Sequence, residues 1–140
     1  ADVDQAAWYG SAVNAMAYLG IVEGVGNGRF NPGGALTQEE FHTIMGRVAR
    51  FFNLQLDAYA DWVAEKESNL TLGQRAALNG YSDWARNSMA VLAWGLEDAL
   101  DGRGDLLFAS LKNLSPKAPM LREEAAAGMY AVLSGLEILP

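Results

Sequence analysis

The sequence contains no cysteine, which excludes disulfides, zinc–thiolate sites and thiol nucleophiles. It has a single histidine, His42, so no cluster of imidazoles is available for a metal ion or for acid–base catalysis. No apolar run reaches roughly 18 residues, so no membrane insertion is expected. Basic residues are also few, since 10 Lys and Arg stand against 17 Asp and Glu, for a net charge of −7. This acidity argues against nucleic acid or an anionic membrane surface as a partner.

β-Branched residues are scarce as well. Val, Ile and Thr together number 14, whereas Ala alone numbers 23. Alanine is the best helix former, and strands favour β-branched side chains. A length of 140 residues is that of one compact domain. The composition therefore predicts a single all-α domain with glycine and proline in its connections.

Apolar residues recur at helical spacing in five segments, and these predict the helices. The predicted ranges are 7–19, 38–52, 57–66, 84–95 and 120–134, with a further helical turn or two within 71–79 and an irregular stretch over 97–118. In the third helix we expect Asp57 as the N-cap and Tyr59, Trp62 and Val63 facing inward.

Three local signals refine this prediction. Thr37 and Glu40 have the spacing of a capping box, in which each side chain bonds the other's backbone N–H. Gly20 follows the first helix where a left-handed residue is favoured. Asn27-Gly28 is a tight-turn signal, so Gly28 is expected to have a positive φ.

An internal repeat organises the sequence. Residues 32–40 align with residues 116–124, and the proline and both glutamates coincide at a constant offset of 84 residues. Upstream, Trp8 pairs with Trp84. Because the same acidic element opens the helices at 38–52 and 120–134, we expect these two helices to pack together at the centre of the domain.

Residues 2–50 resemble a complete S-layer homology repeat, and residues 81–133 resemble a degenerate second copy. The first copy is similar to the family in its Trp-started helix, its Gly-Ile-Val-x-Gly segment, its Gly-x-Gly-x-Phe-x-Pro turn and its Thr- and Glu-containing second helix start. The positions that fit are Asp2, Val3, Trp8, Gly20, Ile21, Val22, Gly24, Asn27, Gly28, Phe30, Pro32, Thr37 and Glu40. The domain then divides into a first repeat at 1–52, a helical connector at 53–80 and a second repeat at 81–140.

The resemblance implies both a fold and a function. Its fold is an all-α assembly of helix–loop–helix repeats around a small central helical bundle. Its function is non-catalytic anchoring of an extracellular, cell-surface protein to bacterial secondary cell-wall polysaccharide, often through a pyruvylated sugar held in grooves between repeats. The alternative is a structural, self-associating module that has lost the glycan. No nucleophile–base or metal constellation is present, so we expect neither an enzyme nor a cofactor.

The resemblance also selects candidate glycan-binding residues. These are Trp8, Asn27, Gly28, Gln38, Asp83, Trp84 and Arg122. Gln38 stands where the family has arginine, so the first copy lacks a guanidinium for an acidic sugar, whereas Arg122 keeps it in the second copy.

Alternatives remain open for three of these side chains. Trp8 and Trp84 either stack on a sugar ring or fill a helix–helix interface. Arg122 either binds a carboxylate or forms an ion pair with Glu123 or Glu124.

Overall fold

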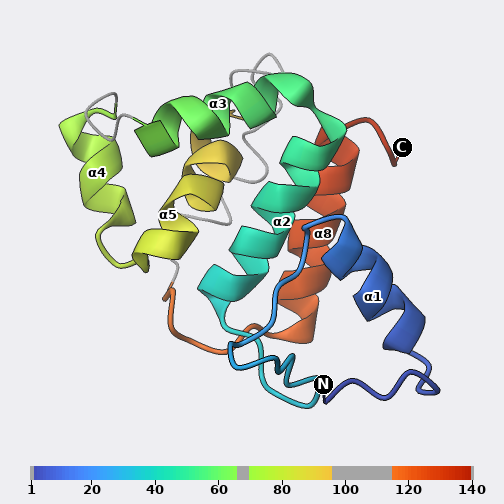
Figure 1. Ribbon diagram of the computed structural model, residues 1–140. Coiled ribbons are helices and arrows are strands. Elements are labelled where there is room, and N and C mark those ends of the chain that lie inside the picture. The colour runs from blue at the N-terminus through green and yellow to red at the C-terminus, as the bar shows by residue number, and fades with distance from the viewer. Residues whose placement is uncertain (1, 66–69, 96–114, 140) are drawn as a thin grey trace. The chain divides into compact units, whose positions relative to one another are not determined.

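The computed structural model describes residues 2–65, 70–95 and 115–139 (Figure 1). Every regular element within these ranges is a helix and none is a β-strand, which confirms the all-α prediction. The protein divides into two compact units, residues 1–35 and residues 36–140. Most of the stretch expected to be irregular, 97–118, lies outside the described residues.

The first unit contains one helix, α1 (Gly10–Tyr18), which is shorter than the predicted 7–19. Its start has no side-chain cap. At its end Gly20 has a φ of +70°, as predicted, and the N–H of Ile21 donates to the carbonyl of Met16 at 2.9 Å. This is the hydrogen bond of a Schellman motif, so the glycine ends α1 by satisfying a carbonyl that the helix leaves free.

Helix α2 (Gln38–Phe52) organises the second unit, and its bounds are those predicted from the sequence. It contacts α3 (Leu54–Glu65), α5 (Asp83–Ala90), the π-helical segment η2 (Val91–Gly95) and α8 (Arg122–Gly135) (Figure 1). The short helix α4 (Leu72–Leu78) lies within the predicted 71–79 and contacts α5.

Helix α3 begins three residues earlier than predicted, and the N-cap assigned to Asp57 is wrong. The side chain of Asn53 accepts from the N–H groups of Gln55 and Leu56, so the helix already starts after Asn53. Asp57 lies one turn into the helix and pairs with Arg50 at 2.8 Å. The inward side of α3 carries Val63, as expected, but Trp62 is 45% exposed.

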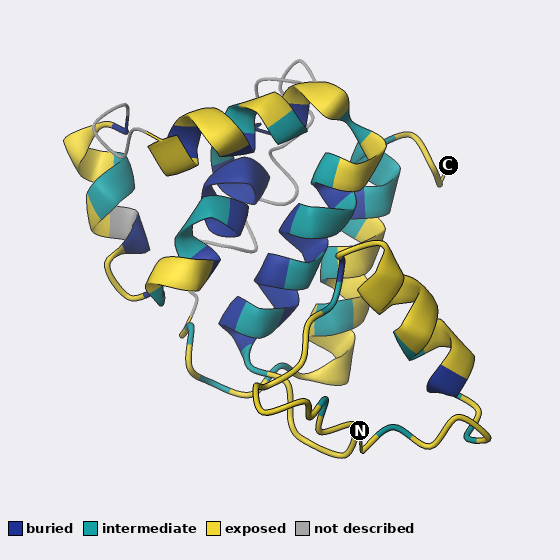
Figure 2. Ribbon diagram, viewed as in Figure 1, coloured by how far each residue is buried: buried dark blue, intermediate teal, exposed yellow. Residues whose placement is uncertain are grey.

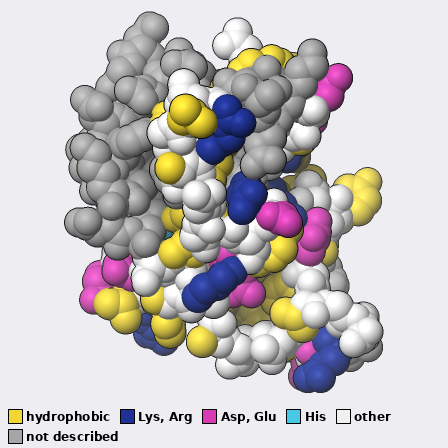
Figure 3. Space-filling model, turned by 90° about the vertical axis from the view of Figure 1, so that its left-hand side faces the viewer, with side chains coloured by type: hydrophobic (Ala, Val, Ile, Leu, Met, Phe, Trp, Pro, Cys, Tyr) yellow, Lys and Arg dark blue, Asp and Glu magenta, His cyan; other side chains and the backbone are white. Residues whose placement is uncertain are grey.

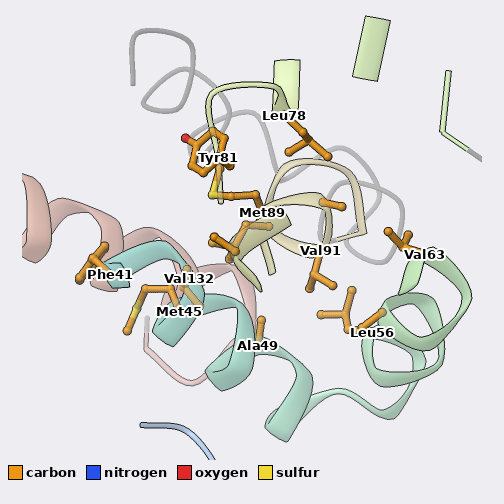
Figure 4. Close-up of a cluster of buried hydrophobic side chains, with 14 of the residues drawn as sticks. Phe41, Met45, Ala49, Leu56, Val63, Leu78, Tyr81, Met89, Val91 and Val132 are labelled. Atoms are coloured by element: carbon orange, nitrogen blue, oxygen red, sulfur yellow. The ribbon is translucent and has the colours of Figure 1, made fainter. Parts of the chain in front are cut away.

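A single apolar core fills the second unit (Figure 4). Its largest fully buried side chains are Leu56, Val91, Leu92 and Val132. Gly46 of α2 lets α5 approach closely, because a Cβ there would lie 2.6 Å from the Cβ of Ser88 and 2.9 Å from its Cα.

Helix α8 packs against α2, as the shared acidic element predicts, but it is not central. Val132 is its one fully buried residue, and most of its surface is exposed or half-buried (Figure 2). Gly128 provides close contact with α2, because a Cβ there would lie 2.8 Å from the ring of Phe41. The bundle is therefore centred on α2 alone, with α8 at its margin.

The close approach at Gly46 gives a stability prediction. Gly46→Ala should lower the free energy of unfolding by about 1–3 kcal/mol, because the clash with the α5 backbone exceeds the roughly 1 kcal/mol gain in helix propensity. Gly73→Ala in α4 is the matched control, since its nearest neighbour would be 4.0 Å away, and this substitution should leave stability unchanged or raise it. Urea unfolding of both variants measures the difference, and equal effects would show that the α2–α5 contact is not tight.

Candidate functional site

The helices α2, α5 and α8 begin at neighbouring places in the second unit. An isolated antiparallel bridge joins Thr37 to Pro119 just before α2 and α8 start. Two backbone hydrogen bonds flank it: Gln38 N–H donates to the Ala118 carbonyl at 2.9 Å, and Met120 N–H donates to the Leu36 carbonyl at 2.8 Å. The two copies of the acidic element therefore lie side by side at their helix starts.

A buried carboxylate connects the start of α5 to this pair. The side chain of Glu39 is 4% exposed and accepts from the N–H of Ser82 at 2.9 Å and from its hydroxyl at 3.0 Å. The ammonium of Lys117 pairs with the same carboxylate at 2.5 Å and also contacts the Ser82 hydroxyl. Ser82 directly precedes α5, so one charged group of α2 holds both α5 and the loop that leads to α8.

The surroundings of Glu39 set its protonation state. Burial alone would raise the pKa of its carboxyl, but the hydrogen bonds from Lys117 and Ser82 together outweigh burial, and the pKa is lowered from the ordinary value. Glu39 is therefore a stable anion at neutral pH. Tyr81 is affected in the opposite direction, because burial and then the Glu39 charge raise its pKa to about 12.

Gln38 has an internal role. It is 8% exposed, and its side-chain oxygen accepts from the backbone N–H of Ser115 at 3.0 Å. The next backbone donors of α2 are also occupied: Glu39 N–H donates to the Pro116 carbonyl, and Glu40 N–H donates to the Thr37 hydroxyl. The reciprocal bond from Thr37 N–H to the Glu40 carboxylate measures 2.8 Å, which confirms the predicted capping box. The first backbone N–H groups of α2 and the Gln38 side chain are therefore already hydrogen-bonded within the protein and are not available to a ligand.

The other candidates of the second unit are exposed. Trp84 is 54% exposed in the first turn of α5, so it does not fill a helix–helix interface. Asp83 precedes it and forms an exposed ion pair with Arg86 at 3.5 Å. Arg122 is exposed at the first position of α8 and forms no ion pair with Glu123 or Glu124 among the described residues. Figure 3 shows Lys and Arg side chains beside Asp and Glu on one face, without a patch of a single sign.

The remaining candidates belong to the first unit. Trp8 is 92% exposed and contacts Tyr9 edge to face, so it also does not fill a helix interface within the described ranges. Asn27 and Gly28 have φ values of +51° and +70° between the hydrogen-bonded residues Gly26 and Arg29, which is a type I′ turn and confirms the positive φ expected at Gly28. The candidates of the first unit and those of the second remain separate predictions.

Sequence reasoning named Asp2 as a position that fits the family but did not predict its partners, and it did not identify Lys117. Asp2 accepts from the N–H groups of Phe30 and Asn31, each at 2.7 Å, and these bonds lower the pKa of its carboxyl. Lys117 pairs with Glu39. Both partnerships span long separations in the sequence, so no local pattern marks them. In the aligned repeats, the segment Pro116-Lys117 corresponds to Pro32-Gly33, and only this difference in residue type was available as a signal.

His42 is a buried group that takes no part in these contacts. It is 6% exposed, and its Nδ1 has no hydrogen-bond partner in the part of the protein that the structure describes. Burial lowers its pKa to about 4, and the Glu124 carboxylate only partly opposes this shift.

Among the residues the structure describes, no three His, Asp or Glu side chains gather as metal ligands, and no helix is long and apolar enough to cross a membrane.

Residues 1–41 match the family model of the S-layer homology domain. The match covers the first unit and the first four residues of α2. Domains of this family are non-catalytic modules that anchor proteins to cell-wall polymers, so the match indicates a cell-surface or cell-wall association. Searches of curated proteins and of solved structures gave no match. The degenerate repeat at 81–133 lies outside the matched residues and stays a prediction.

The buried Glu39–Lys117 pair predicts a loss of stability when its cation is removed. Lys117→Met keeps most of the aliphatic stem but removes the cation, so that Ser82 is the remaining partner of Glu39. The free energy of unfolding should fall by about 1–2 kcal/mol. This value allows for screening by solvent, because the Lys117 side chain is 63% exposed. Arg50→Met is the matched control, since Arg50 pairs with a half-exposed Asp57, and it should cost under about 1 kcal/mol. Chemical denaturation compares the two, and an equal loss would contradict the special role of Glu39.

His42 predicts a pH dependence with a definite sign. Its folded pKa of about 4 lies below the ordinary 6.5, so the unfolded state takes up a proton first as the pH falls. Stability should therefore decrease from about pH 6.5 down to about pH 4, by roughly 3 kcal/mol at most. His42→Leu should abolish this part of the decrease. Denaturation of both proteins across that range measures it, and parallel curves would refute the assignment.

Proposed function

We propose that this protein is a non-catalytic module that anchors a cell-surface protein to bacterial secondary cell-wall polysaccharide. The match of residues 1–41 to the S-layer homology domain carries the proposal. The proposal includes the division into a first repeat at 1–52, a connector at 53–80 and a second repeat at 81–140. The paired helix starts of α2 and α8 support that division, because the repeated acidic elements lie side by side.

The proposed binding surface of the second unit lies at the starts of α5 and α8. Trp84 offers an exposed aromatic face on which a sugar ring can stack, and Arg122 offers an exposed guanidinium. A guanidinium binds a carboxylate through two parallel hydrogen bonds, so Arg122 suits an acidic sugar such as a pyruvylated one. Gln38 is assigned to the fold instead, because its side chain already accepts from Ser115.

In the first unit we propose Trp8, Asn27 and Gly28 as further glycan contacts. Trp8 is almost fully exposed, and the Asn27-Gly28 turn presents backbone groups at an exposed loop tip. Asp83 is proposed as a hydrogen-bond acceptor beside Trp84, since its side chain is 95% exposed.

A self-associating module is the second candidate, and the surface of α8 favours it. Met129, Tyr130, Ile138 and Leu139 are each 40% exposed or more, which is unusual for a cluster of apolar residues on one helix and its extension. Sedimentation velocity over a range of protein concentrations distinguishes a monomer from such an assembly.

The wall-binding proposal predicts a specific loss of affinity. Arg122→Ala should weaken binding to purified wall sacculi by about 10–150-fold, because a charge-assisted hydrogen bond contributes roughly 1.5–3 kcal/mol. Arg50→Ala removes the same charge at the other end of α2 and should leave binding unchanged. Co-sedimentation with sacculi, before and after the secondary polymer is stripped, gives both affinities, and circular dichroism verifies the fold. Absence of binding by the parent protein, or equal binding to stripped walls, would refute the proposal.

A further inference from the structure

The sequence contains two Asn-Gly pairs, Asn27-Gly28 and Asn79-Gly80. In this dipeptide the backbone nitrogen of glycine attacks Cγ of the asparagine more readily than any other residue's nitrogen does, because no Cβ hinders it. Both pairs have the same intrinsic chemistry, so any difference between them in the folded protein comes from their surroundings.

The first pair is at the tip of an exposed loop. Residues 23–29 are all exposed, and a Cβ on Gly28 would meet no atom within 4 Å. Two backbone hydrogen bonds hold the turn, from Arg29 N–H to the Gly26 carbonyl at 3.0 Å and from Val25 N–H to the Arg29 carbonyl at 2.8 Å. Such a tip opens at low cost, because no buried side chain has to leave the core.

Asn79 and Gly80 are themselves exposed, but the residues on either side of them are buried. Asn79 ends α4 and is preceded by Leu78, which is 5% exposed, while Gly80 is followed by Tyr81, which is 8% exposed. The N–H of Tyr81 donates to the Leu78 carbonyl at 2.9 Å. A Cβ on Gly80 would lie 3.4 Å from the ring of Pro116. Opening this segment would expose core residues, so it should follow the unfolding of the unit.

We propose that Asn27-Gly28 is a site of spontaneous modification, at which Asn27 is converted to isoaspartate and aspartate. The Gly28 nitrogen bonds to Cγ of Asn27 and closes a five-membered succinimide, while the bond between Cγ and Nδ2 of Asn27 breaks and ammonia leaves with the proton lost by Gly28. Water then opens either carbonyl of the ring. One water is consumed and one ammonia is released, so the conversion needs no oxidant, reductant or enzyme.

Asp2 controls the rate of this conversion. Asn27 has a φ of +51°, in the left-handed region, and we infer that this turn conformation must open before the Gly28 nitrogen reaches Cγ. Asp2 opposes the opening, because its two carboxylate oxygens hold the N–H groups of Phe30 and Asn31 directly after the turn. Isoaspartate adds a backbone carbon and a negative charge, and neither fits a two-residue type I′ turn, so the modified loop no longer returns to its original conformation.

The experiment follows the two pairs in the same sample. The full-length protein is incubated at mildly alkaline pH, and peptide mapping by mass spectrometry, with isoaspartate-specific methylation, measures conversion at each asparagine over time. In the folded protein Asn27 should convert at least about tenfold faster than Asn79, which corresponds to a difference in opening free energy of about 1.4 kcal/mol. In concentrated urea the two rates should become similar. Equal rates in the folded protein, or conversion of neither pair while folded, would overturn the proposal.

Two variants test the role of Asp2 and the chemistry. Asp2→Asn keeps the size of the side chain but loses the charge and one acceptor, and it should speed conversion of Asn27 several-fold while leaving Asn79 unchanged. An unchanged Asn27 rate would show that Asp2 does not control the turn. Asn27→Gln should stop the conversion at this position, because ring closure would then require a six-membered ring. Circular dichroism of both variants verifies that α1 and the second unit stay folded.

Discussion

The arrangement of the second unit depends on the buried carboxylate of Glu39. A charge removed from water costs several kcal/mol unless partners replace its hydration. Ser82 and Lys117 supply those partners, and they lie 43 and 78 residues away in the sequence. If either segment moved away, the charge would lose hydrogen-bond partners while its own side chain is only 4% exposed. Two effects therefore fix the positions of α5 and of the loop before α8. One is packing in the apolar core, and the other is the free-energy cost of leaving the Glu39 carboxylate without its hydrogen-bond partners.

In each of the two aligned segments, a backbone N–H that precedes a proline is held by a side chain from a distant part of the sequence. Asn31 and Ser115 occupy equivalent positions, each before a proline, and each N–H needs an acceptor. Asp2 provides the acceptor for Asn31, and Gln38 provides the acceptor for Ser115. A guanidinium has only donors, so arginine at position 38 would be unable to accept from Ser115. The glutamine that departs from the family pattern is thus explained by a hydrogen bond inside this protein.

Features with a local cause could be predicted from the sequence. The α2 bounds, the Thr37–Glu40 capping box and the positive φ of Gly20 and Gly28 depend on neighbours within a few residues. The start of α3 was misplaced because Asn53 competes with Asp57 as a cap, and both residue types are good N-caps. The contacts of Glu39 with Lys117 and of Asp2 with the loop could not be predicted, because sequence spacing contains no information about partners so far apart. The expectation that α8 is central was wrong, because the acidic element that it shares with α2 marks a helix start and contains no information about how deeply the helix is buried.

These contacts also bear on the proposed binding of an anionic ligand. A helix start attracts anions through its free N–H groups and the positive end of its dipole. At α2 the first donors already bond to the carbonyls of Ala118 and Pro116 and to the Thr37 hydroxyl, and the adjacent Lys117 is paired with Glu39. At α8 the first residue is the exposed Arg122, and Leu121 provides no hydroxyl to cap the helix. At the start of α2 the first donors are used in internal bonds, whereas at the start of α8 the Glu124 carboxylate accepts from the Leu121 N–H and the exposed Arg122 is the first helical residue.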